Sequence, residues 1–423
     1  MAYFRINGQK PISGEISVTG AKNAALKFIA ASLVCDGPVR LTNMPDIQDV
    51  RRMLTLVAAL GVGVKHDREA HVVELDPRTL SSFEIPADLA KTIRTSIMLV
   101  GPLLTRFNKA CIGFPGGCVI GRRPIDLYLK GYELFGASIH DVGDAFEFVA
   151  PHLQPMTFVF PIISVVATET FLITASRIPG ITILKNAAQE PEVVALAEFL
   201  SACGARITGA GTPTITIEGV ASLSGGEFEI IPDRIEAGTF VILGALTRGR
   251  VRVTNCNPEH LENLLAHLEM AGAPFDVGEN WIETKPYQHA LRAVNVKTHE
   301  YPGFVTDVQA PFTVLLTQAE GNSLVHETIF EGRMFYTDLL NRMGANIILC
   351  DPHRAIVQGA TPLMGRKLES PDIRAGIAMV LAGLIAKGET IIANIEMIDR
   401  GYENIDARLR SLGADIVRVQ DIE

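Results

Sequence analysis

The chain has 423 residues, of which 48% are hydrophobic and 20% charged, with a formal net charge of −9. This length exceeds one ordinary core and predicts two globular domains, and the composition excludes a disordered or fibrous protein. The acidic balance argues against general binding to nucleic acid or to anionic membranes, whereas small anionic ligands remain open.

The six cysteines are spread along the chain and form no Cys-x-x-Cys pair. This spacing favours reduced thiols in a cytoplasmic protein over a disulfide framework or a zinc site. Residues 1–13 carry no apolar stretch typical of a signal peptide, and the apolar run at 377–386 is well short of the ~20 residues that span a bilayer. We therefore expect a cytoplasmic protein with no metal site and no membrane partner.

Along the chain, a phrase of helical periodicity that ends in glycine and leads into a β-type run occurs six times, at intervals of about 70 residues. Each glycine can supply the left-handed residue that ends a helix. The six copies are Leu60-Gly61-Val62, Phe135-Gly136-Ala137, Cys203-Gly204-Ala205, Ala271-Gly272-Ala273, Met343-Gly344-Ala345 and Leu412-Gly413-Ala414.

A second helical segment precedes each phrase, and the sequence predicts these segments at 20–34, 87–104, 165–176, 234–247, 306–318 and 372–386. Short β-type runs separate or follow the helices, at 39–43, 181–184, 215–218, 251–255 and 390–393. Every unit therefore mixes strand and helix, which predicts an α/β protein.

Six units divide naturally into two domains of three. The boundary is expected near Ile230 to Pro232, where a proline breaks a β-type run. The first domain then spans residues 20–231, and the second spans 232–423 together with 1–19. The β-type residues 3–19 have no partner unit of their own, so we expect them to complete the last unit.

One loop, residues 114–124, places Cys118 among three glycines and beside Arg122 and Arg123. Glycines allow close approach to a ligand, and arginines bind anions and favour a thiolate. The alternative is a surface loop with an incidental cysteine. The loop by itself does not decide between the two.

Charged side chains also gather where the helices begin. Asp233, Asp307 and Asp372 are each explained most simply as a helix N-cap. Lys22 and Arg94 are not, because a cation at a helix N-terminus opposes the dipole and needs an anion, such as a substrate phosphate. Helix starts that face one cleft would together attract such anions. For Arg400, the simple alternative is a surface ion pair with Asp399 or Glu403.

Several phrases together resemble the UDP-N-acetylglucosamine 1-carboxyvinyltransferase family from end to end, and the cysteine loop is the most specific of them. The phrases are Gly20-Ala21-Lys22-Asn23-Ala24-Ala25, Pro115-Gly116-Gly117-Cys118-Val119-Ile120-Gly121, Arg123-Pro124-Ile125-Asp126, Asn186-Ala187-Ala188, Glu190-Pro191-Glu192, Pro232-Asp233-Arg234-Ile235-Glu236, Thr306-Asp307 and Asp399-Arg400-Gly401-Tyr402-Glu403.

The resemblance implies two inside-out α/β barrels, each of three similar strand–helix units, which agrees with the repeat. It also implies transfer of the enolpyruvyl group of phosphoenolpyruvate to the 3-hydroxyl of UDP-N-acetylglucosamine, with release of phosphate. That reaction is the first committed step of peptidoglycan precursor synthesis, and it uses no cofactor and no metal. The expected partners are these two small molecules, and the chain is expected to act as a monomer.

Residue roles follow from the resemblance by position. Cys118 matches the acid, which phosphoenolpyruvate can also trap covalently, and Asp307 matches the base. The cation cluster matches Lys22, Arg94, Arg123, Arg374 and Arg400. Asn23 and Glu190 match polar residues that organise the sugar, and Asp372 and Arg333 match charged partners at a closing interface. The other substrate-binding positions are Pro124, Ile125, Asp126, Leu127, Ser164, Val165, Val166 and Ile329.

Some positions depart from the family pattern. Val166 stands where a glycine is common, Ile162 where some members have lysine, Pro311 where glutamine is frequent and Gly332 where asparagine is found. The first two lie on the nucleotide side and suggest, as an alternative, a paralogous transferase for another uridine nucleotide. The related shikimate 3-phosphate enzyme lacks the cysteine loop. A catalytically silent binding protein, or a purely structural repeat protein, would not explain the intact Cys118, Asp307, Lys22 and Arg400.

Overall fold

The computed structural model describes residues 2–114, 116 and 125–420. These residues divide into two compact units. One is drawn from residues 20–231 and is called the 20–231 unit; the other is drawn from residues 2–19 and 232–420 and is called the 232–420 unit. No helix in the described ranges combines the length and apolar character needed to cross a membrane.

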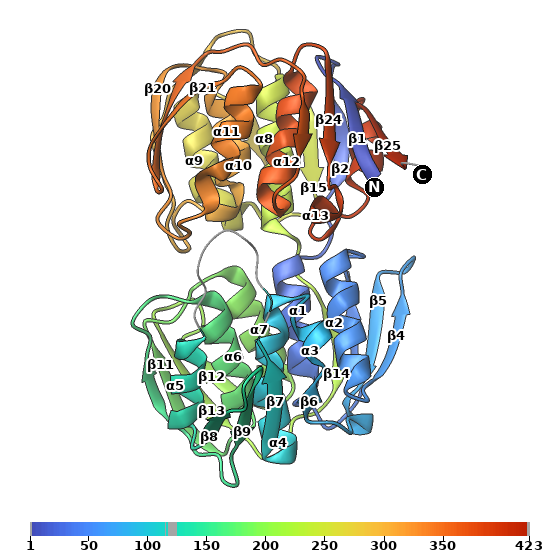
Figure 1. Cartoon of the computed structure of the whole chain (residues 1–423), viewed down its shortest axis with the longest axis vertical. Helices are drawn as coiled ribbons and strands as arrows, with labels where there is room; N and C mark the ends of the chain where they lie inside the picture. The colour runs from blue at the N-terminus through green and yellow to red at the C-terminus, as the bar shows by residue number, and fades with distance from the viewer. Residues whose placement is uncertain (1, 115, 117–124, 421–423) are drawn as a thin grey trace. The chain divides into compact units, whose positions relative to one another are not determined.

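The 20–231 unit alternates helices with short strands (Figure 1). Its helices are α1 (Lys22–Ser32), α2 (Gln48–Ala59), η1 (Pro77–Thr79), α3 (Ala87–Ala90), η2 (Arg94–Leu99), α4 (Val100–Phe107), α5 (Asp126–Leu134), α6 (Val165–Ser176) and α7 (Pro191–Ala202). Its strands are β3 (Val39–Thr42), β4 (Gly63–Asp67), β5 (Val72–Asp76), β6 (Glu84–Ile85), β7 (Lys109–Gly113), β8 (Ser138–Asp141), β9 (Ala145–Val149), β10 (Thr157–Val159), β11 (Gly180–Lys185), β12 (Arg206–Thr208), β13 (Thr214–Gly219) and β14 (Gly226–Glu229).

The 232–420 unit is built in the same way. Its helices are α8 (Arg234–Thr247), η3 (Pro258–Leu261), α9 (Glu262–Ala271), α10 (Thr306–Leu316), η4 (Arg333–Phe335), α11 (Tyr336–Arg342), α12 (Ile373–Ile385), α13 (Glu396–Asp399) and α14 (Ile405–Ser411). Its strands are β1 (Ala2–Asn7), β2 (Gly14–Ser17), β15 (Val251–Thr254), β16 (Phe275–Val277), β17 (Trp281–Thr284), β18 (Leu291–Arg292), β19 (Val296–Lys297), β20 (Ala319–His326), β21 (Asn346–Asp351), β22 (Arg354–Gly359), β23 (Lys367–Glu369), β24 (Glu389–Ala393) and β25 (Asp415–Gln420).

Every sheet of the described chain repeats one pairing pattern, in which a parallel pair is followed by two antiparallel pairs. In the 20–231 unit the strand orders are β14-β3-β5-β4, β6-β7-β9-β8 and β10-β11-β13-β12. In the 232–420 unit they are β2-β15-β17-β16, β18-β20-β22-β21 and β23-β24-β1-β25. The repeat inferred from the glycine phrases is therefore a repeat of sheet topology.

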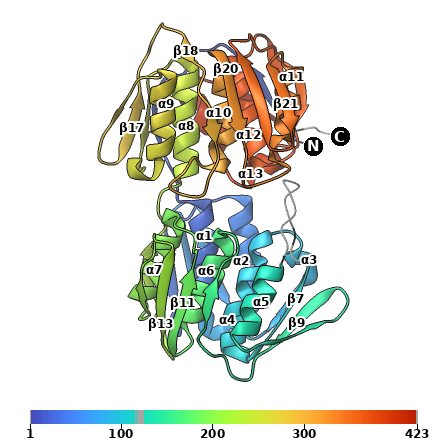
Figure 2. The ribbon, with the colours of Figure 1, turned by 90° about the vertical axis from the view of Figure 1, so that its left-hand side faces the viewer.

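Helices fill the inside of each unit and sheets lie outside them, as Figures 1 and 2 show. In the 232–420 unit, α8 and α12 bury almost their whole surface, because their sequences are apolar on all sides. Helix α10 packs against both. In the 20–231 unit, α6 is buried in the same way and packs against α4 and α7. This is the inside-out α/β barrel arrangement that the family resemblance implies.

The N-terminal strands and the six repeat glycines can now be placed in the fold. Strand β1 lies between β24 and β25, so the first β-type residues complete the last unit as expected. The expectation is wrong for β2, which pairs with β15 in the sheet of the fourth unit. All six glycines of the repeated phrase have φ between +85° and +122°, which confirms their predicted left-handed role.

Most predicted helices match within two residues, but the continuous helix predicted at 87–104 is wrong. The structure has α3, η2 and α4 there instead. Ile93 interrupts the helix with an extended backbone (φ −145°, ψ 127°), and its side chain is 3% exposed. Burial of a β-branched side chain against the core has overridden the helical pattern.

Candidate active site

Lys22 opens α1 and pairs with a buried aspartate. Its Nζ lies 2.8 Å from Oδ2 of Asp49, whose side chain is only 3% exposed, and Arg52 approaches the other Asp49 oxygen at 3.6 Å. The anion that a lysine needs at a helix start is therefore supplied, at least in part, by the protein. Sequence reasoning missed Asp49, because an acidic residue in the first turn of α2 is ordinary on its own.

Arg94 begins η2, and burial lowers its pKa from the usual arginine value, with Tyr128 acting in the opposite direction. The described part of the cysteine loop lies against the segment that leads to Arg94. The Gly116 amide donates to the Ala90 carbonyl at 3.1 Å, and a Cβ on Gly116 would lie 1.8 Å from the Lys91 carbonyl oxygen. Only glycine fits there. Cys118, Arg123 and Pro124 lie outside the described residues.

The helices α5 and α6 begin with residues assigned to the nucleotide. Ile125 directly precedes α5, and Asp126 and Leu127 form its first turn. Ser164 caps α6, where its Oγ accepts a hydrogen bond from the Ala167 amide at 3.4 Å, and Val165 and Val166 follow as the first helical residues. A twelve-residue helix that begins in this way presents backbone N–H groups and a positive dipole end, which suit phosphate.

Glu190 is the residue before α7, and it does not cap that helix with its side chain. It is 7% exposed, so its carboxyl group lies inside the unit rather than on the surface. Asn23 lies beside Lys22 in the first turn of α1 and is partly exposed.

In the 232–420 unit, Asp307 lies between two guanidiniums. Nη1 of Arg333 donates to Oδ1 of Asp307 at 2.7 Å, and Nη2 of Arg374 donates to Oδ2 at 2.9 Å. Burial alone would favour the neutral acid, but the charges of Arg374 and Arg333 outweigh it and hold the pKa of Asp307 well below its usual range. Asp307 is therefore a carboxylate at neutral pH.

Arg374 is itself held from several directions. Burial would lower its pKa, but Asp307 raises it above the usual value. Nη1 of Arg374 donates to the Tyr402 hydroxyl at 3.4 Å, and that hydroxyl lies 2.9 Å from Thr239 Oγ1 on α8. The starts of α10 and α12 and the side of α8 are thereby linked at one end of the unit.

The N-cap interpretation holds for two of the three aspartates. Asp233 accepts from the amides of Ile235 and Glu236, and Asp372 accepts from those of Arg374 and Ala375. For Asp307 it is wrong. The residue before α10 is Val305, and the Asp307 side chain turns to the two arginines instead.

Glu327 is a second residue that sequence reasoning missed. It is fully buried just after β20, where Oε2 accepts from Thr306 Oγ1 at 2.8 Å and Oε1 accepts from the amides of Ile329 and Phe330 at 2.8 and 3.1 Å. It thus connects the residue before Asp307 to the segment that carries Ile329 and leads to η4. No spacing in the sequence marks this role, because the residues it joins are about 20 positions apart.

Arg400 follows α13, where its Nη1 lies 3.9 Å from Met397 Sδ. Asp399, one of the two partners considered for it, forms a two-point ion pair with Arg418 at 2.7 and 2.8 Å. Pro311 lies inside α10 and lacks the N–H that would donate to the Asp307 carbonyl. Gly332 directly precedes Arg333 at the start of η4.

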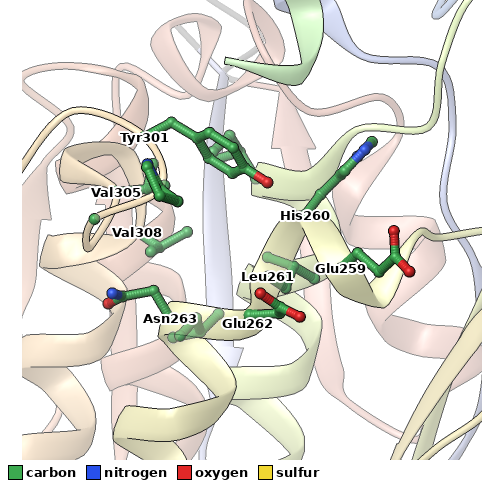
Figure 3. Close-up of a pocket in the computed structure, with 12 residues that line it drawn as sticks. Glu259, His260, Leu261, Glu262, Asn263, Tyr301, Val305 and Val308 are labelled. Carbon is green, nitrogen blue, oxygen red and sulfur yellow. The ribbon is translucent and has the colours of Figure 1, made fainter. Parts of the chain in front are cut away.

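A small pocket lies beside the start of α10. It is lined by Tyr301 and Val305, which face Leu261 and Glu262 across it (Figure 3). Its volume of about 20 Å³ admits a water molecule but no sugar or phosphate. Within residues 2–114, 116 and 125–420, no group of three or more His, Cys, Asp or Glu is arranged to hold a metal ion.

The structure thus brings three assigned residues into direct contact, namely Asp307, Arg333 and Arg374, with Asp372 capping the helix that carries Arg374. In the 20–231 unit, Lys22 and Asn23 open a buried helix and Ser164 precedes another, as the sequence predicts, and Glu190 precedes α7. Asp49 and Glu327 are added as their supports.

Similarity to known proteins identifies the family of this chain. A family model described as EPSP synthase (3-phosphoshikimate 1-carboxyvinyltransferase) matches residues 6–409. A protein of Cellvibrio japonicus named UDP-N-acetylglucosamine 1-carboxyvinyltransferase is 44% identical over 99% of this chain and all of its own length. One of the same name from Saccharophagus degradans is 44% identical over 98% of both chains. The chain belongs to the UDP-N-acetylglucosamine 1-carboxyvinyltransferase family. It is therefore an enolpyruvyl transferase.

Solved structures agree with the fold of this transferase. The enolpyruvyl transferase NikO from Streptomyces tendae superposes with a TM-score of 0.90 at 26% identity, covering 99% of each chain. EPSP synthase from Acinetobacter baumannii reaches a TM-score of 0.73 at 18% identity, covering 99% of this chain and all of its own. The second likeness bears on the fold alone.

Proposed function

We propose that this transferase moves the enolpyruvyl group of phosphoenolpyruvate to the 3-hydroxyl of UDP-N-acetylglucosamine and releases phosphate. The full-length identity of 44% to two transferases named for this substrate supports the choice of acceptor. The observation that carries the chemistry is the Asp307 carboxylate held between Arg333 and Arg374. A paralogous transferase for another uridine nucleotide is not favoured by these relatives.

The reaction is an addition followed by an elimination. In the addition, the sugar oxygen bonds to C2 of phosphoenolpyruvate, the hydroxyl proton passes to a base, and C3 gains a proton from an acid. In the elimination, C3 loses a proton, the bond from C2 to the phosphate oxygen breaks, and inorganic phosphate leaves. The enzyme must supply an acid, a base, and cations for the carboxylate and the phosphate.

Asp307 is proposed as the base. With its pKa held low by two guanidiniums, it is ionised but weakly basic. An incoming carboxylate or phosphate that draws Arg374 or Arg333 toward itself would weaken their hold on Asp307 and make it a better base. Arg333 and Arg374 would thus couple binding of the donor to activation of the acceptor hydroxyl, so that Asp307 acts as a base only when donor and acceptor are both present.

The other assigned groups complete the proposal. Lys22, oriented by Asp49, and Arg94, Arg123, Arg374 and Arg400 would hold the donor's negative charges. Cys118 would protonate C3 and could be trapped as a covalent adduct. The start of α6, with Ser164, Val165 and Val166, would receive the diphosphate, and Pro124, Ile125, Asp126, Leu127 and Ile329 would contact the nucleotide sugar. Asn23 and Glu190 would order the sugar, and Asp372 and Arg333 would act where the site closes.

In the cell we propose a cytoplasmic, monomeric enzyme of peptidoglycan precursor synthesis, a process needed for cell shape and division. Phosphate release with phosphoenolpyruvate and a panel of uridine nucleotides tests the substrate. Turnover that requires UDP-N-acetylglucosamine is expected, and no turnover with it would overturn the proposal. Cys118→Ser should severely slow turnover while leaving nucleotide binding intact, and unchanged turnover would refute the role of Cys118.

A further inference from the structure

A buried ion pair joins α1 to α6 inside the 20–231 unit. Lys27 Nζ lies 3.1 Å from Oε2 of Glu169, and the two side chains are 4% and 0% exposed. Ala24, Phe28 and Phe171 are buried on the same two helices, and the other buried polar side chains of α6 are uncharged. Neither residue belongs to the catalytic groups proposed above.

The pair lies one turn inside the helix ends that are assigned to the substrate. Lys27 follows Asn23 by four residues on α1, and Glu169 follows Val165 by four residues on α6. Residues four apart share a helix face, so each charge lies on the same face as a residue assigned to the site.

The start of α7 belongs to the same cluster. The pKa of Glu169 is raised to about 7, mainly by burial and in part by the charges of Glu192 and Glu190, which together outweigh the lowering effect of Lys27. Glu190 directly precedes α7, and Glu192 lies in its first turn and is 3% exposed. The charges of Glu190 and Glu192 thus reach the buried carboxyl group of Glu169, beneath the starts of α6 and α7.

Such a pair is a poor source of stability. Removing two charges from water costs several kcal/mol each, and buried ion pairs can often be replaced by apolar residues at no loss of stability. What an ion pair does provide is a fixed geometry, because its partners tolerate only one mutual placement. The placement fixed here is that of the first turns of α1 and α6 relative to each other, and both helices pack against α7.

We propose that Lys27 and Glu169 are positioning residues that align the substrate-facing starts of α1, α6 and α7 and thereby set the affinity for the nucleotide sugar. The inference rests on the proposed function, because it takes Asn23, Ser164 to Val166 and Glu190 as the nucleotide-sugar side of the site. It identifies the interior of this unit, beneath that side, as a determinant of acceptor affinity.

The test uses an apolar replacement that keeps the unit folded. The double variant Lys27→Met/Glu169→Leu removes both charges at similar volume, and Glu169→Gln removes one. Arg177→Met is the matched control. Its guanidinium pairs with Asp36 at 2.5 Å. Arg177 directly follows α6 and Asp36 lies just beyond α1, so this pair lies at the opposite ends of the same two helices.

For the double variant we expect a melting temperature close to that of the unchanged enzyme, a KM for UDP-N-acetylglucosamine raised about 10-fold, and a KM for phosphoenolpyruvate changed less than about twofold. The control should lose thermal stability with both KM values retained. If the double variant keeps both KM values, or if both substrates are affected in proportion to a loss of stability, the pair is only structural and the proposal is overturned.

Calorimetric titration with UDP-N-acetylglucosamine, without phosphoenolpyruvate, separates this inference from the proposed function. If the enzyme without substitutions binds the nucleotide sugar but does not turn it over, the proposed function is refuted, and the Kd values of the variants can still be compared. Weaker binding by the double variant alone supports the inference. If the enzyme without substitutions does not bind UDP-N-acetylglucosamine, both the proposed function and the positioning role of Lys27 and Glu169 are refuted.

Discussion

The contact between Arg333 and Asp307 can be weighed by a double-mutant cycle of Arg333→Met, Asp307→Asn and their combination. The donor and acceptor atoms are 2.7 Å apart, the arginine side chain is 6% exposed and the aspartate 21%. Two unit charges about 4 Å apart at an effective dielectric constant of ~20 interact by about 4 kcal/mol. Partial exposure of Asp307 and the remaining charge of Arg374 reduce this, so we expect a coupling free energy of about 2 kcal/mol at pH 7.

Unfolding of the 232–420 unit, which holds the Arg333–Asp307 pair, can be followed by tryptophan fluorescence. Trp281 is the only tryptophan of the chain and lies in β17 of the 232–420 unit. Its fluorescence in urea titrations therefore reports the free energy of unfolding of that unit. The exposed pair Arg354–Asp351, 2.6 Å apart in the same unit, serves as the control and should show a much smaller coupling free energy, because solvent screens it.

The pH dependence has a definite sign. The pKa of Asp307 is lower in the folded than in the unfolded chain, so its stabilising contribution is present above the unfolded pKa, about 3.9, and is lost as pH falls toward the folded pKa. The stabilising contribution of the Asp307 carboxylate, measured as the difference in unfolding free energy between the unsubstituted protein and Asp307→Asn, should therefore be smaller at pH 3 than at pH 7. A coupling at pH 7 no larger than that of the exposed pair would refute the electrostatic account of Asp307.

Three further outcomes follow from the buried acids. Asp49→Asn should raise the KM for phosphoenolpyruvate about 10-fold and leave that for the nucleotide sugar nearly unchanged, in steady-state assays; equal changes in both would show that Asp49 does not act through Lys22. Glu327→Gln should lower the unfolding free energy reported by Trp281 by about 2 kcal/mol, and no change would contradict its role in ordering the 329–330 backbone. Because the pKa of Glu169 is raised to about 7 in the fold from 4.5, the folded state binds more protons between these values, and stability should fall as pH rises through this window. Circular dichroism during urea unfolding should show that this fall disappears in Glu169→Gln, and an identical fall in both proteins would assign it to another group.

Much of the fold could be predicted because its signals are local. A helix that ends in a left-handed glycine is recognisable from a few residues, and six copies at even spacing predict a repeat. Sheet order is not local. That β14 pairs with β3 and β2 with β15 depends on residues about 190 to 240 positions apart, which no periodicity encodes.

The candidate site divides in the same way. Helix-start residues such as Lys22, Asp307 and Arg374 could be selected because their types and positions are unusual for a helix start or match a family motif. Their partners could not. Asp49 and Glu169 are ordinary acids in ordinary helices, and only burial beside a cation gives them a role. Asp307 shows the converse error, since the simplest local explanation, an N-cap, was displaced by two arginines that are distant in sequence.

Identification of the product is the decisive test of enolpyruvyl transfer to UDP-N-acetylglucosamine. Purified enzyme is incubated with phosphoenolpyruvate and UDP-N-acetylglucosamine, released phosphate is counted, and the nucleotide product is examined by mass spectrometry and proton NMR. We expect one phosphate for each nucleotide sugar consumed and an enolpyruvyl ether at the 3-hydroxyl, with its two vinyl protons. Phosphate release that does not depend on the nucleotide sugar, or a nucleotide recovered unchanged, would contradict it.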